Sequence, residues 1–557
     1  MFIKVLEPSP KITTSTEYDF YLSQDKWNDF SFKTQYHLTL SSKHSPDGKP
    51  VNIGIVKILK KDQTADLCFR IDIGPLATLD ESYCSLGQSL DYYERLSNID
   101  EKLRIRLFSF LRDVVIHPEY KANLINEEGW NKSLLRDFDE QDDIFTIAPF
   151  VVSKEYSHFP DLDTVFKFHS EGLEHALSLD FDAPSIGFEE SLPGRVMVLV
   201  GRNGCGKSTL LSKISRIAFA APADRNDQSL RKVGYLEPKG IGFPKILNIS
   251  YSAFDSFQVP GIYRSEKVQI AKELEQHLGR YIFCGIRDVV AELKAALATD
   301  KMNKNDKLSE QNIIADRQNS TLLKPVEQLA AEFVELIDKI ESDKNERLFS
   351  KVLQIIAKEP SFAQYNISGW ADISRMDFKK LFMQLSTGHK FVLHSLTNIV
   401  AHTGARTLIL FDEPETHLHP PLLAVLMDAI RYVLEKKNAF AIVATHSPVV
   451  IQETLSRHVR IIRRHEGLTK IIEPEIQTFG ESIGLITSHV FQLSSDVSDY
   501  HNVLDTVYNH AVFTASTPWD IQAIMKKIEK VFSDDLSMQG RAYLMSKLAS
   551  AKHSRGR

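Results

Sequence analysis

Short apolar runs that each end in a polar turn recur in the middle of the chain. Residues 196–200 read VMVLV, residues 408–411 read LILF, and residues 440–444 read FAIVA. Continuous apolar runs of this length are typical of parallel strands that are buried on both faces of a sheet. Because stretches with helical periodicity separate them, the pattern predicts an α/β fold with a mainly parallel sheet.

The pattern in residues 1–150 is different. Residues 36–42 (YHLTLSS), 51–59 (VNIGIVKIL) and 67–73 (LCFRIDI) read as strands, and the last alternates strictly between apolar and polar positions. A helical stretch follows at about 90–116. We therefore expect a β-rich accessory region followed by helices, which could offer a surface to a partner.

Charged helical patterns fill much of the chain between and after the apolar runs. The stretches AKELEQHLGRYIF and LAAEFVELIDKIES show no sustained heptads, so they predict a compact insertion rather than a coiled-coil arm. The insertion is either purely structural or the surface that senses a trigger. The expected units are an accessory region at 1–150, the first half of the core at 165–260, a helical insertion or lid at 261–370, the second half of the core at 371–470 and a helical C-terminal region at 471–557.

Composition excludes several classes of protein. The 557 residues are 43% hydrophobic and 25% charged, with a net charge of −6, which argues against a surface coated with basic residues. Contact with nucleic acid would need a local patch, and residues 458–465 (HVRIIRRH) and 552–557 (KHSRGR) are either such patches or solvated faces. The start lacks the apolar core of a signal peptide, and no apolar run approaches membrane-spanning length.

Four cysteines are scattered without a C-x-x-C pair, which disfavours a zinc site and a disulfide framework. They are Cys68, Cys84, Cys205 and Cys284. A reducing compartment fits this usage, so we expect a cytoplasmic protein with no membrane segment.

The first apolar run leads into a phosphate-binding pattern. Gly201-x-x-x-x-Gly206-Lys207-Ser208 lies between an expected strand and an expected helix, which is the context of a Walker A loop. Glycines let backbone N–H groups wrap phosphates, Lys207 would contact the β- and γ-phosphates of ATP, and the Ser208 hydroxyl would bind Mg²⁺. The side chain of Cys205 is expected to turn outward. The predicted nucleotide contacts in this loop are Gly201, Arg202, Asn203, Gly204, Cys205, Gly206, Lys207, Ser208 and Thr209.

The second apolar run ends in paired carboxylates, as a Walker B strand requires. Asp412 would order the water shell of the metal, and Glu413 would polarise the attacking water. The predicted metal residues are therefore Ser208 and Asp412, with Glu413 as catalytic base. The nearby pair His417 and His419 lacks a third ligand of suitable spacing, so no metal site is predicted there.

The third apolar run ends at His446. A residue at the carboxyl end of a buried parallel strand faces the crevice where such sheets bind ligands. We expect the neutral imidazole of His446 to hydrogen-bond the γ-phosphate and to report its loss. The alternative is a capping residue before Ser447 and Pro448.

Residues 385–391, LSTGHKF, are either an ordinary helix start or a phosphate-sensing loop. A helical stripe follows them and leads to the Walker B strand, which is the element order of an ATP-binding cassette. Ser386 would offer a hydroxyl and Gly388 a bare backbone N–H at a helix N-terminus, aimed at anionic oxygen.

These motifs together resemble the ABC-type ATPases of the SMC, RecF and overcoming-lysogenization (OLD) group, in which DEPExxLHP and THSP recur. LSTGH resembles their LSGGQ signature, with Thr387 and His389 as departures. The resemblance implies an ABC-type (RecA-like) ATPase core, ATP with Mg²⁺, and a homo-oligomer that dimerises on ATP, since the signature serves the nucleotide of the opposite subunit. The Q-loop glutamine of the family has one candidate, Gln258.

A second resemblance is to the PtuA-type ATPases of Septu and retron-associated antiphage systems. It rests on ISYSAFDSF (249–257), YIFCGIRD (281–288) and SLGQSLDYYERL (85–96). It implies an HNH-type nuclease partner and, in retron versions, a reverse transcriptase with its RNA–DNA product (msDNA).

The chain itself has no recognisable nuclease domain. The acidic pair of residues 180 and 182 in SLDFD fits an antiparallel strand ahead of the Walker A loop better than a catalytic D-x-D. The leading interpretation is an antiphage ATPase that regulates a nuclease. The alternatives are a RecF/SMC-like DNA-repair ATPase that clamps DNA directly, and a nucleotide-gated scaffold, against which Glu413 argues.

Overall fold

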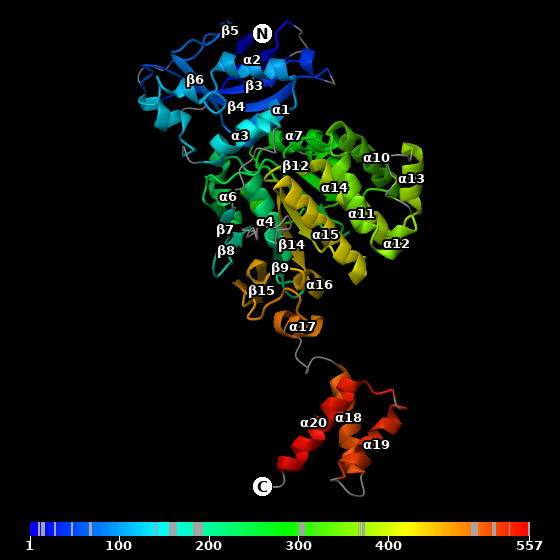
Figure 1. Ribbon diagram of the computed structural model, residues 1–557. Helices are drawn as coiled ribbons and strands as arrows, with labels where there is room; N and C mark the ends of the chain where they lie inside the picture. Colours follow the sequence, from blue (N-terminus) through cyan, green and yellow to red (C-terminus); the bar gives the residue numbers. More distant parts are fainter. Residues whose placement is uncertain are drawn as a thin grey trace. The chain divides into compact units, whose positions relative to one another are not determined.

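Strands and helices of the chain are arranged as in Figure 1, a computed structural model. The chain divides into two compact units, Met1–Glu481 and Ser482–Arg557. In the described residues of the first unit, the strands form three sheets. The structure describes the chain apart from residues 9, 11, 13–16, 27–28, 46–47, 66–68, 140–141, 155–163, 182–192, 300–306, 319, 366, 368, 370–373, 492–498, 515–519, 534 and 555–557.

The N-terminal sheet has the strand order β5-β1-β2-β3-β4-β6. β1 and β2 run parallel, and the other neighbours pair antiparallel. Helices α1 (Leu90–Ser97) and α3 (Asp143–Ser153) pack together beside it, and α2 (Glu101–Leu111) follows α1. The strands are β1 (Ile3–Leu6), β2 (Phe20–Gln24), β3 (Gln35–Leu40), β4 (Val51–Lys60), β5 (Gly74–Leu76) and β6 (Tyr83–Gly87).

Residues 67 and 68 of one expected strand lie outside the described residues, and the rest of that strand does not form. Residues 69–73 have no strand structure, and Ile71 is buried whereas Ile73 is exposed, so the two do not share a face. The physical reason is that side chains take the backbone hydrogen bonds of Ile71. Its N–H donates to the Tyr36 hydroxyl at 3.0 Å, and its carbonyl accepts from Gln24 Nε2 at 2.9 Å.

The central sheet has the order β12-β11-β13-β14-β9-β15-β16, in which every neighbouring pair is parallel except β15 with β16. Every residue of β9 and β14 is buried, which explains their continuous apolar runs. The strands are β12 (Tyr281–Gly285), β11 (Ile246–Ser250), β13 (Leu408–Asp412), β14 (Phe440–Thr445), β9 (Val196–Val200), β15 (Val459–His465) and β16 (Leu468–Ile472). The predicted α/β fold class is confirmed.

The register of this sheet brings distant parts of the sequence together. β14 lies between β13 and β9, with Ala444 opposite Asp412 and Thr445 opposite Val200. Since these strands are parallel, their carboxyl ends meet at one edge. That edge carries the residues that follow β9, β13 and β14.

Helices cover the central sheet, as Figure 1 shows. α4 (Lys207–Phe219), α14 (Thr387–His402) and α15 (Pro420–Lys437) each contact its strands or one another. A small antiparallel sheet has the order β10-β7-β8: β7 (Val165–His169) and β8 (Leu177–Asp180) precede β9 in the chain, and β10 (Tyr235–Glu237) follows it. Asp180 ends β8, and residue 182 lies outside the described residues.

The segment 261–370 is mostly helical but differs from the expected lid in one respect. β12 lies within it and forms the end of the central sheet, because its apolar residues pair along the whole length of β11. The helices are α7 (Arg264–Glu275), α8 (Val289–Thr299), α9 (Glu310–Ile314), α10 (Val326–Ser342), α11 (Glu346–Ile356) and α12 (Pro360–Ala363), and α13 (Arg375–Gln384) follows.

The unit Ser482–Arg557 is described as helices, with no strand among its described residues. Its core is apolar and includes Leu504, Ile528 and Leu544. The helices are α17 (Ile483–Phe491), α18 (Asp499–Phe513), α19 (Ile521–Val531) and α20 (Met538–Ser554). Across the described residues of both units, no helix is long and apolar enough to cross a membrane.

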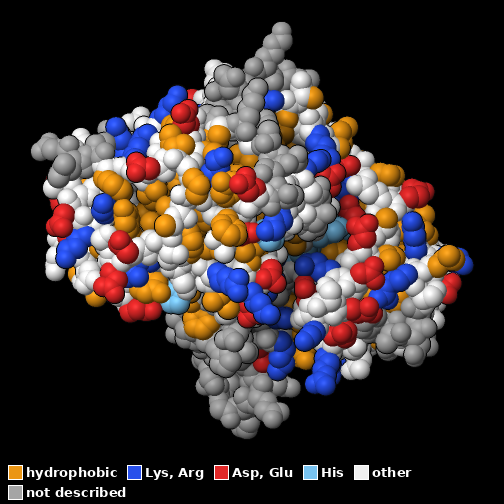
Figure 2. All heavy atoms as spheres, turned by 90° about the horizontal axis from the view of Figure 1, so that it is seen from above, with side chains coloured by type: hydrophobic (Ala, Val, Ile, Leu, Met, Phe, Trp, Pro, Cys, Tyr) orange, Lys and Arg blue, Asp and Glu red, His pale blue; other side chains and the backbone are white. Residues whose placement is uncertain are grey.

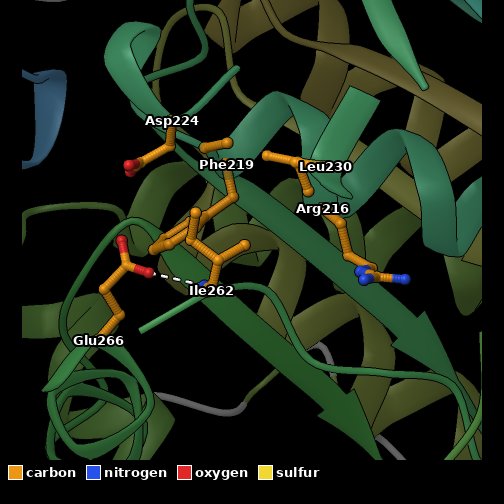
Figure 3. A pocket seen from close by; sticks show the side chains of 8 residues that line it. Arg216, Phe219, Asp224, Leu230, Ile262 and Glu266 are labelled. Carbon is orange, nitrogen blue, oxygen red and sulfur yellow. Dashed lines mark hydrogen bonds between the residues drawn. The ribbon is translucent and has the colours of Figure 1, made fainter. Parts of the chain in front are cut away.

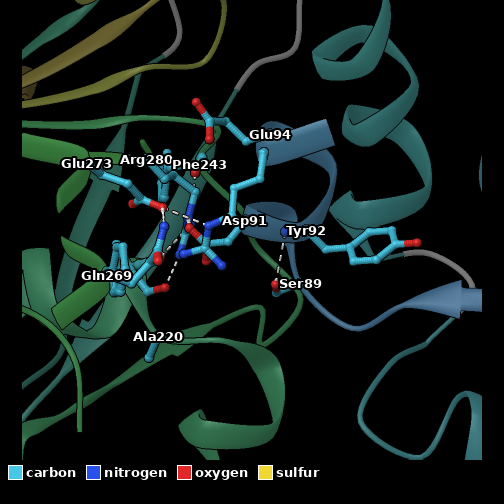
Figure 4. Close-up of polar contacts among 12 residues, drawn as sticks. Ser89, Asp91, Tyr92, Glu94, Ala220, Phe243, Gln269, Glu273 and Arg280 are labelled. Atoms are coloured by element: carbon cyan, nitrogen blue, oxygen red, sulfur yellow. Dashed lines mark hydrogen bonds and ion pairs between the residues drawn. The ribbon is translucent and has the colours of Figure 1, made fainter. Parts of the chain in front are cut away.

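Ion pairs join the N-terminal region to the region around the central sheet within the first unit (Figure 4). Arg280 Nε contacts Asp91 Oδ1 at 3.0 Å, and Arg95 Nε contacts Glu273 Oε1 at 2.7 Å. Arg280 also donates to the carbonyls of Phe243 and Phe219. On the face seen in Figure 2, basic side chains (Lys and Arg) and acidic side chains (Asp and Glu) are interspersed.

Candidate active site

The loop between β9 and α4 is built to approach a ligand closely. Gly204 and Gly206 have φ of 79° and 101°, a conformation that favours glycine. A β-carbon on Gly201 would lie 2.4 Å from the carbonyl oxygen of Ile462, so this position also requires glycine. Arg202, Asn203 and Gly204 form the exposed rim of the loop.

Lys207 and Cys205 both point inward. The Lys207 side chain is buried, and its Nζ donates to the carbonyls of Gly201 at 3.0 Å and Arg202 at 3.4 Å. The ammonium is thus held against the loop that would cradle phosphates. Cys205 is buried in the hydrophobic core, so the expectation that its side chain turns outward is wrong. Its Sγ fills the space that Gly201 leaves free.

Ser208 lies at the start of α4 and Asp412 at the end of β13, and the two side chains meet at the edge of the central sheet. Ser208 Oγ donates to Asp412 Oδ1 at 2.8 Å. Burial raises the pKa of Asp412 to about 7, the bond from Ser208 opposes this, and the charges of Glu413 and Asp255 add to it. A hydroxyl beside a half-buried carboxylate is a donor set that fits Mg²⁺. Ser208 and Asp412 would hold that ion, which would neutralise phosphate charge.

Asp255 is a carboxylate at this edge that the sequence did not single out. It follows β11, is buried, and acts on Asp412 electrostatically. Arg287 Nη1 lies 3.4 Å from its Oδ1 and holds it in place. The Q-loop candidate Gln258 does not take this position, because its side chain donates to the carbonyl of Arg317 at 3.1 Å. The signal for Asp255 was its place just after an apolar strand.

The backbone at Glu413 is held in an unusual conformation. Its φ is 48°, in the left-handed region that non-glycine residues rarely adopt, and its N–H donates to the carbonyl of Ala444 at 2.8 Å. Glu413 Oε1 lies 3.9 Å from His446 Nδ1, and its side chain is half-exposed. The carboxylate can therefore reach a water molecule at the edge where phosphates would lie.

His446 has a carboxylate partner that the sequence reasoning missed. Its Nδ1 lies 2.9 Å from Glu415 Oε1, and its backbone N–H donates to the same oxygen at 2.6 Å. The hydrogen bond with Glu415 raises the pKa of His446, although burial opposes the shift. Burial raises the pKa of Glu415, but the bonds from His446 outweigh it and the net shift is downward. The second Glu of DEPE was the available signal.

This contact changes the role expected for His446. Because Nδ1–H points at Glu415, only Nε2 remains for a ligand. In a neutral ring with that tautomer Nε2 is an acceptor, which a phosphate oxygen would repel. The protonated ring can donate from Nε2, so the charged form suits a γ-phosphate better than the neutral form expected from the sequence.

Ser386 and Gly388 lie at the start of α14. Ser386 caps the helix by accepting from the N–H of His389. A β-carbon on Gly388 would lie 2.9 Å from the carbonyl oxygen of His417, in the turn that follows the acidic strand. The two motifs therefore pack against each other, and glycine permits the contact.

His417 and His419 gain no further ligand, since no group of three or more metal-binding side chains occurs among the described residues. A cavity between α4 and α7 is lined by residues that include Asp224, Glu266 and Arg216 (Figure 3). It has room for little more than water. Burial and the charge of Glu266 raise the pKa of Asp224 well above its usual value.

One known protein resembles nearly the whole chain, and solved structures resemble a little over half of it. The chain is 29% identical over 540 residues to "Protein ea59" of Escherichia phage lambda, a match that covers 94% of each protein. An ATP-binding cassette of an ABC transporter, MJ1267 in its ADP conformation, is 15% identical and covers 58% of this chain and 94% of its own, with a TM-score of 0.27. The SmcHead bound to the C-winged helix domain of ScpA is 12% identical and covers 56% and 97%, with a TM-score of 0.25.

A family match falls on the site itself. Residues 196–452 match the family described as "AAA domain, putative AbiEii toxin, Type IV TA system". These residues begin at β9 and end with α16 (Pro448–Gln452), so they contain the phosphate-binding loop, the acidic strand and His446. Residues 196–452 are thus similar in sequence to an AAA-type ATPase domain.

Proposed function

We propose that this protein binds and hydrolyses ATP with Mg²⁺, dimerises over two ATP molecules, and uses that cycle to control a partner. The observation that carries the proposal is the meeting of Ser208 and Asp412 at 2.8 Å beside the phosphate-binding loop. Lys207 reaches the same loop, and Glu413 and His446 follow the neighbouring strands.

The arrangement supplies the parts that hydrolysis of a phosphoanhydride needs. The loop N–H groups and Lys207 would bind the β- and γ-phosphates, and Ser208 and Asp412 would hold Mg²⁺. Glu413 would take the proton of the attacking water. His446, charged and held by Glu415, would donate from Nε2 to the γ-phosphate.

A dimer follows from the place of Ser386 and Gly388. Ser386 caps a different helix, α14, and Gly388 lies in its first turn; neither is hydrogen-bonded to the phosphate-binding loop of its own chain among the described residues. In the ABC-type arrangement that the signature resembles, these groups complete the site of a second copy. ATP would then close two subunits over two shared sites.

For the partner, we propose a nuclease of the HNH type in a phage-related defence system. The resemblance of three stretches to PtuA-type ATPases supports it. The described C-terminal residues are helical and show no nuclease motif, so cleavage would be the task of another chain. A relative encoded by phage lambda fits a role in conflict between phage and host. A reverse transcriptase with its RNA–DNA product would join in the retron form of such a system.

The alternative is a RecF/SMC-like ATPase that clamps DNA directly. The net charge of −6 weighs against a broad basic surface, and the face seen in Figure 2 carries charges of both signs. A clamp would bind duplex DNA tightly in an ATP-dependent and salt-sensitive way. The nuclease-linked protein would instead need its partner for cleavage and would bind bare DNA weakly.

Two measurements test the proposal. In light scattering, wild type should dimerise with ATP and Mg²⁺, Lys207→Ala should stay monomeric with little ATP bound, and Glu413→Gln should form a long-lived dimer with turnover reduced at least 100-fold. Wild-type turnover in Glu413→Gln would place the base elsewhere. Purification of the tagged protein from its host should recover a nuclease chain, whereas duplex DNA alone would favour the clamp.

A further inference from the structure

We propose that His389 sets the direction of the Ser386 hydroxyl, and that docking of ATP phosphate on Ser386 is coupled to uptake of a proton by His389. The inference rests on the proposed function, since it assumes that Ser386 meets the nucleotide of a second subunit. It adds a positioning residue that couples nucleotide recognition to pH.

A chain of hydrogen bonds runs from α12 to the start of α14. Ser386 Oγ lies 2.7 Å from His389 Nδ1, and His389 Nε2 lies 2.8 Å from Ser361 Oγ. Ser361 Oγ then donates to Glu359 Oε2, and the Ser361 N–H donates to the same oxygen at 2.8 Å. Every link is between side chains whose residues are buried or half-buried, apart from the exposed Ser386.

The direction of each bond follows from Glu359. Burial raises the pKa of Glu359, but the bonds from Ser361 outweigh it and the net shift is downward, so this carboxylate is ionised and can only accept. The single proton of the Ser361 hydroxyl therefore goes to Glu359. Ser361 Oγ must then accept from His389 Nε2–H.

The neutral His389 ring consequently has its lone pair on Nδ1. The proton of the Ser386 hydroxyl is the only one that can fill the 2.7 Å contact at Nδ1. In this state Ser386 presents only lone pairs to its surroundings, and these repel phosphate oxygens. In the free subunit with a neutral His389, Ser386 therefore cannot donate a hydrogen bond to a phosphate oxygen.

A proton from solvent reverses the last bond. With both ring nitrogens protonated, Nδ1–H donates to Ser386 Oγ and the Ser386 O–H becomes free to donate to a phosphate oxygen. The bond from Nε2–H to Ser361 is unchanged. No covalent bond forms or breaks apart from the N–H bond made by the added proton.

The surroundings of His389 keep the ring neutral until an anion arrives. Burial lowers its pKa, Glu359 on α12 opposes this, and His419 ahead of α15 adds to it. The rings of Phe362 and Tyr365 flank the imidazole, with centroids 4.5 Å and 5.5 Å away. The negative charge of a γ-phosphate at Ser386 would raise the pKa and draw the proton in.

The test compares ATP-driven dimerisation across pH in the Glu413→Gln background, where the dimer persists. Sedimentation between pH 6 and 8.5 should show the dimer weakening as pH rises. With one proton taken up per subunit, its dissociation constant should rise by up to about 100-fold per pH unit above the pKa of His389. His389→Gln, which places an amide where the ABC-type signature has glutamine, should remove most of that slope.

His419→Gln is the matched control, because it removes a nearby histidine that does not touch Ser386. It should keep the slope. A second measurement needs no variant at position 389: calorimetry of dimerisation at pH 7.5 in two buffers of different ionisation enthalpy should reveal proton uptake. Equal slopes with and without His389, or no proton uptake, would overturn this inference alone. Absence of an ATP-dependent dimer at every pH would overturn the proposed function as well.

Discussion

Ser208 Oγ lies 2.8 Å from Asp412 Oδ1, although 204 positions separate the two residues in the sequence. The serine begins α4 and the aspartate ends β13, and β14 separates β13 from β9 in the sheet. Parallel pairing brings both to the edge where an Mg²⁺–nucleotide complex would bind.

Asp412→Asn should abolish hydrolysis while leaving the fold intact. Asparagine keeps the hydrogen bond to Ser208 but removes the negative charge that would hold Mg²⁺, so turnover should fall by at least about 100-fold. It should also remove a carboxylate whose ionised form is disfavoured by burial, and the free energy of unfolding at pH 8 should not decrease. Phosphate release and denaturant unfolding measure the two effects.

The direction of the effect on the free energy of unfolding follows from the raised pKa of Asp412. The pKa of Asp412 is raised to about 7 in the folded state from its usual 3.8, so ionisation of this group lowers stability as pH rises between those values. The free energy of unfolding of the Mg²⁺-free wild type should therefore rise relative to that of Asp412→Asn when the pH falls from 8 to 5. A constant difference between the two proteins over that range would contradict the assignment.

Glu415→Gln should shift the pH dependence of hydrolysis. Glu415 raises the pKa of His446, so the charged ring, which we propose donates to the γ-phosphate, should persist to higher pH in wild type. The amide removes that support, and the alkaline fall in activity should begin at lower pH in the variant. The pH profile of turnover with saturating ATP measures the shift, and Glu453→Gln, in a pair with Arg431 away from the site, is the control.

Gly388→Ala should impair dimerisation without preventing ATP binding by the monomer. Its β-carbon would lie 2.9 Å from the His417 carbonyl, so the start of α14 must move away from the turn after the acidic strand. We expect the dimer to weaken by about tenfold or more, which corresponds to about 1.4 kcal/mol. In Gly484→Ala the new methyl meets nothing within 4 Å, and dimerisation should be unchanged.

Asp91→Ala should destabilise the junction between the N-terminal region and the ATPase core. Arg280 is 3% exposed, and removal of its carboxylate partner leaves a buried charge held by carbonyls and by the Phe219 ring. The free energy of unfolding should fall by about 3–5 kcal/mol. Urea unfolding measures the loss. Glu275→Ala breaks the exposed pair with Lys294, and a similar loss in that control would show that burial is not the cause.

The local sequence pattern was sufficient for the elements around the site. The apolar run of residues 196–200 forms β9, the run of residues 440–444 lies in β14, and α4 begins at Lys207. Such runs are informative because burial on both faces removes polar residues from a strand. Glycines at 204 and 206 were informative because positive φ demands them.

The pattern failed where long-range partners decide. Residues 69–73 alternate like a strand, yet Tyr36 and Gln24 take the hydrogen bonds of Ile71 and no strand forms. β12 lies in a segment that reads as helical and charged, yet it pairs with β11. Neither partner can be found from local periodicity, because the pairing depends on which strand lies alongside.

Some chemical groups of the site could be predicted from local sequence motifs, and others are brought together only by tertiary packing. Lys207, Asp412 and Glu413 stand in motifs whose spacing follows from the chain itself, since each lies a fixed number of residues from a strand end. The partners of the two histidines do not: Glu415 with His446, and Ser361 and Glu359 with His389, meet only after the sheet and the insertion have packed. The sequence alone established the ATPase motifs because backbone geometry imposes their order, whereas tertiary packing decided which side chains orient and charge them.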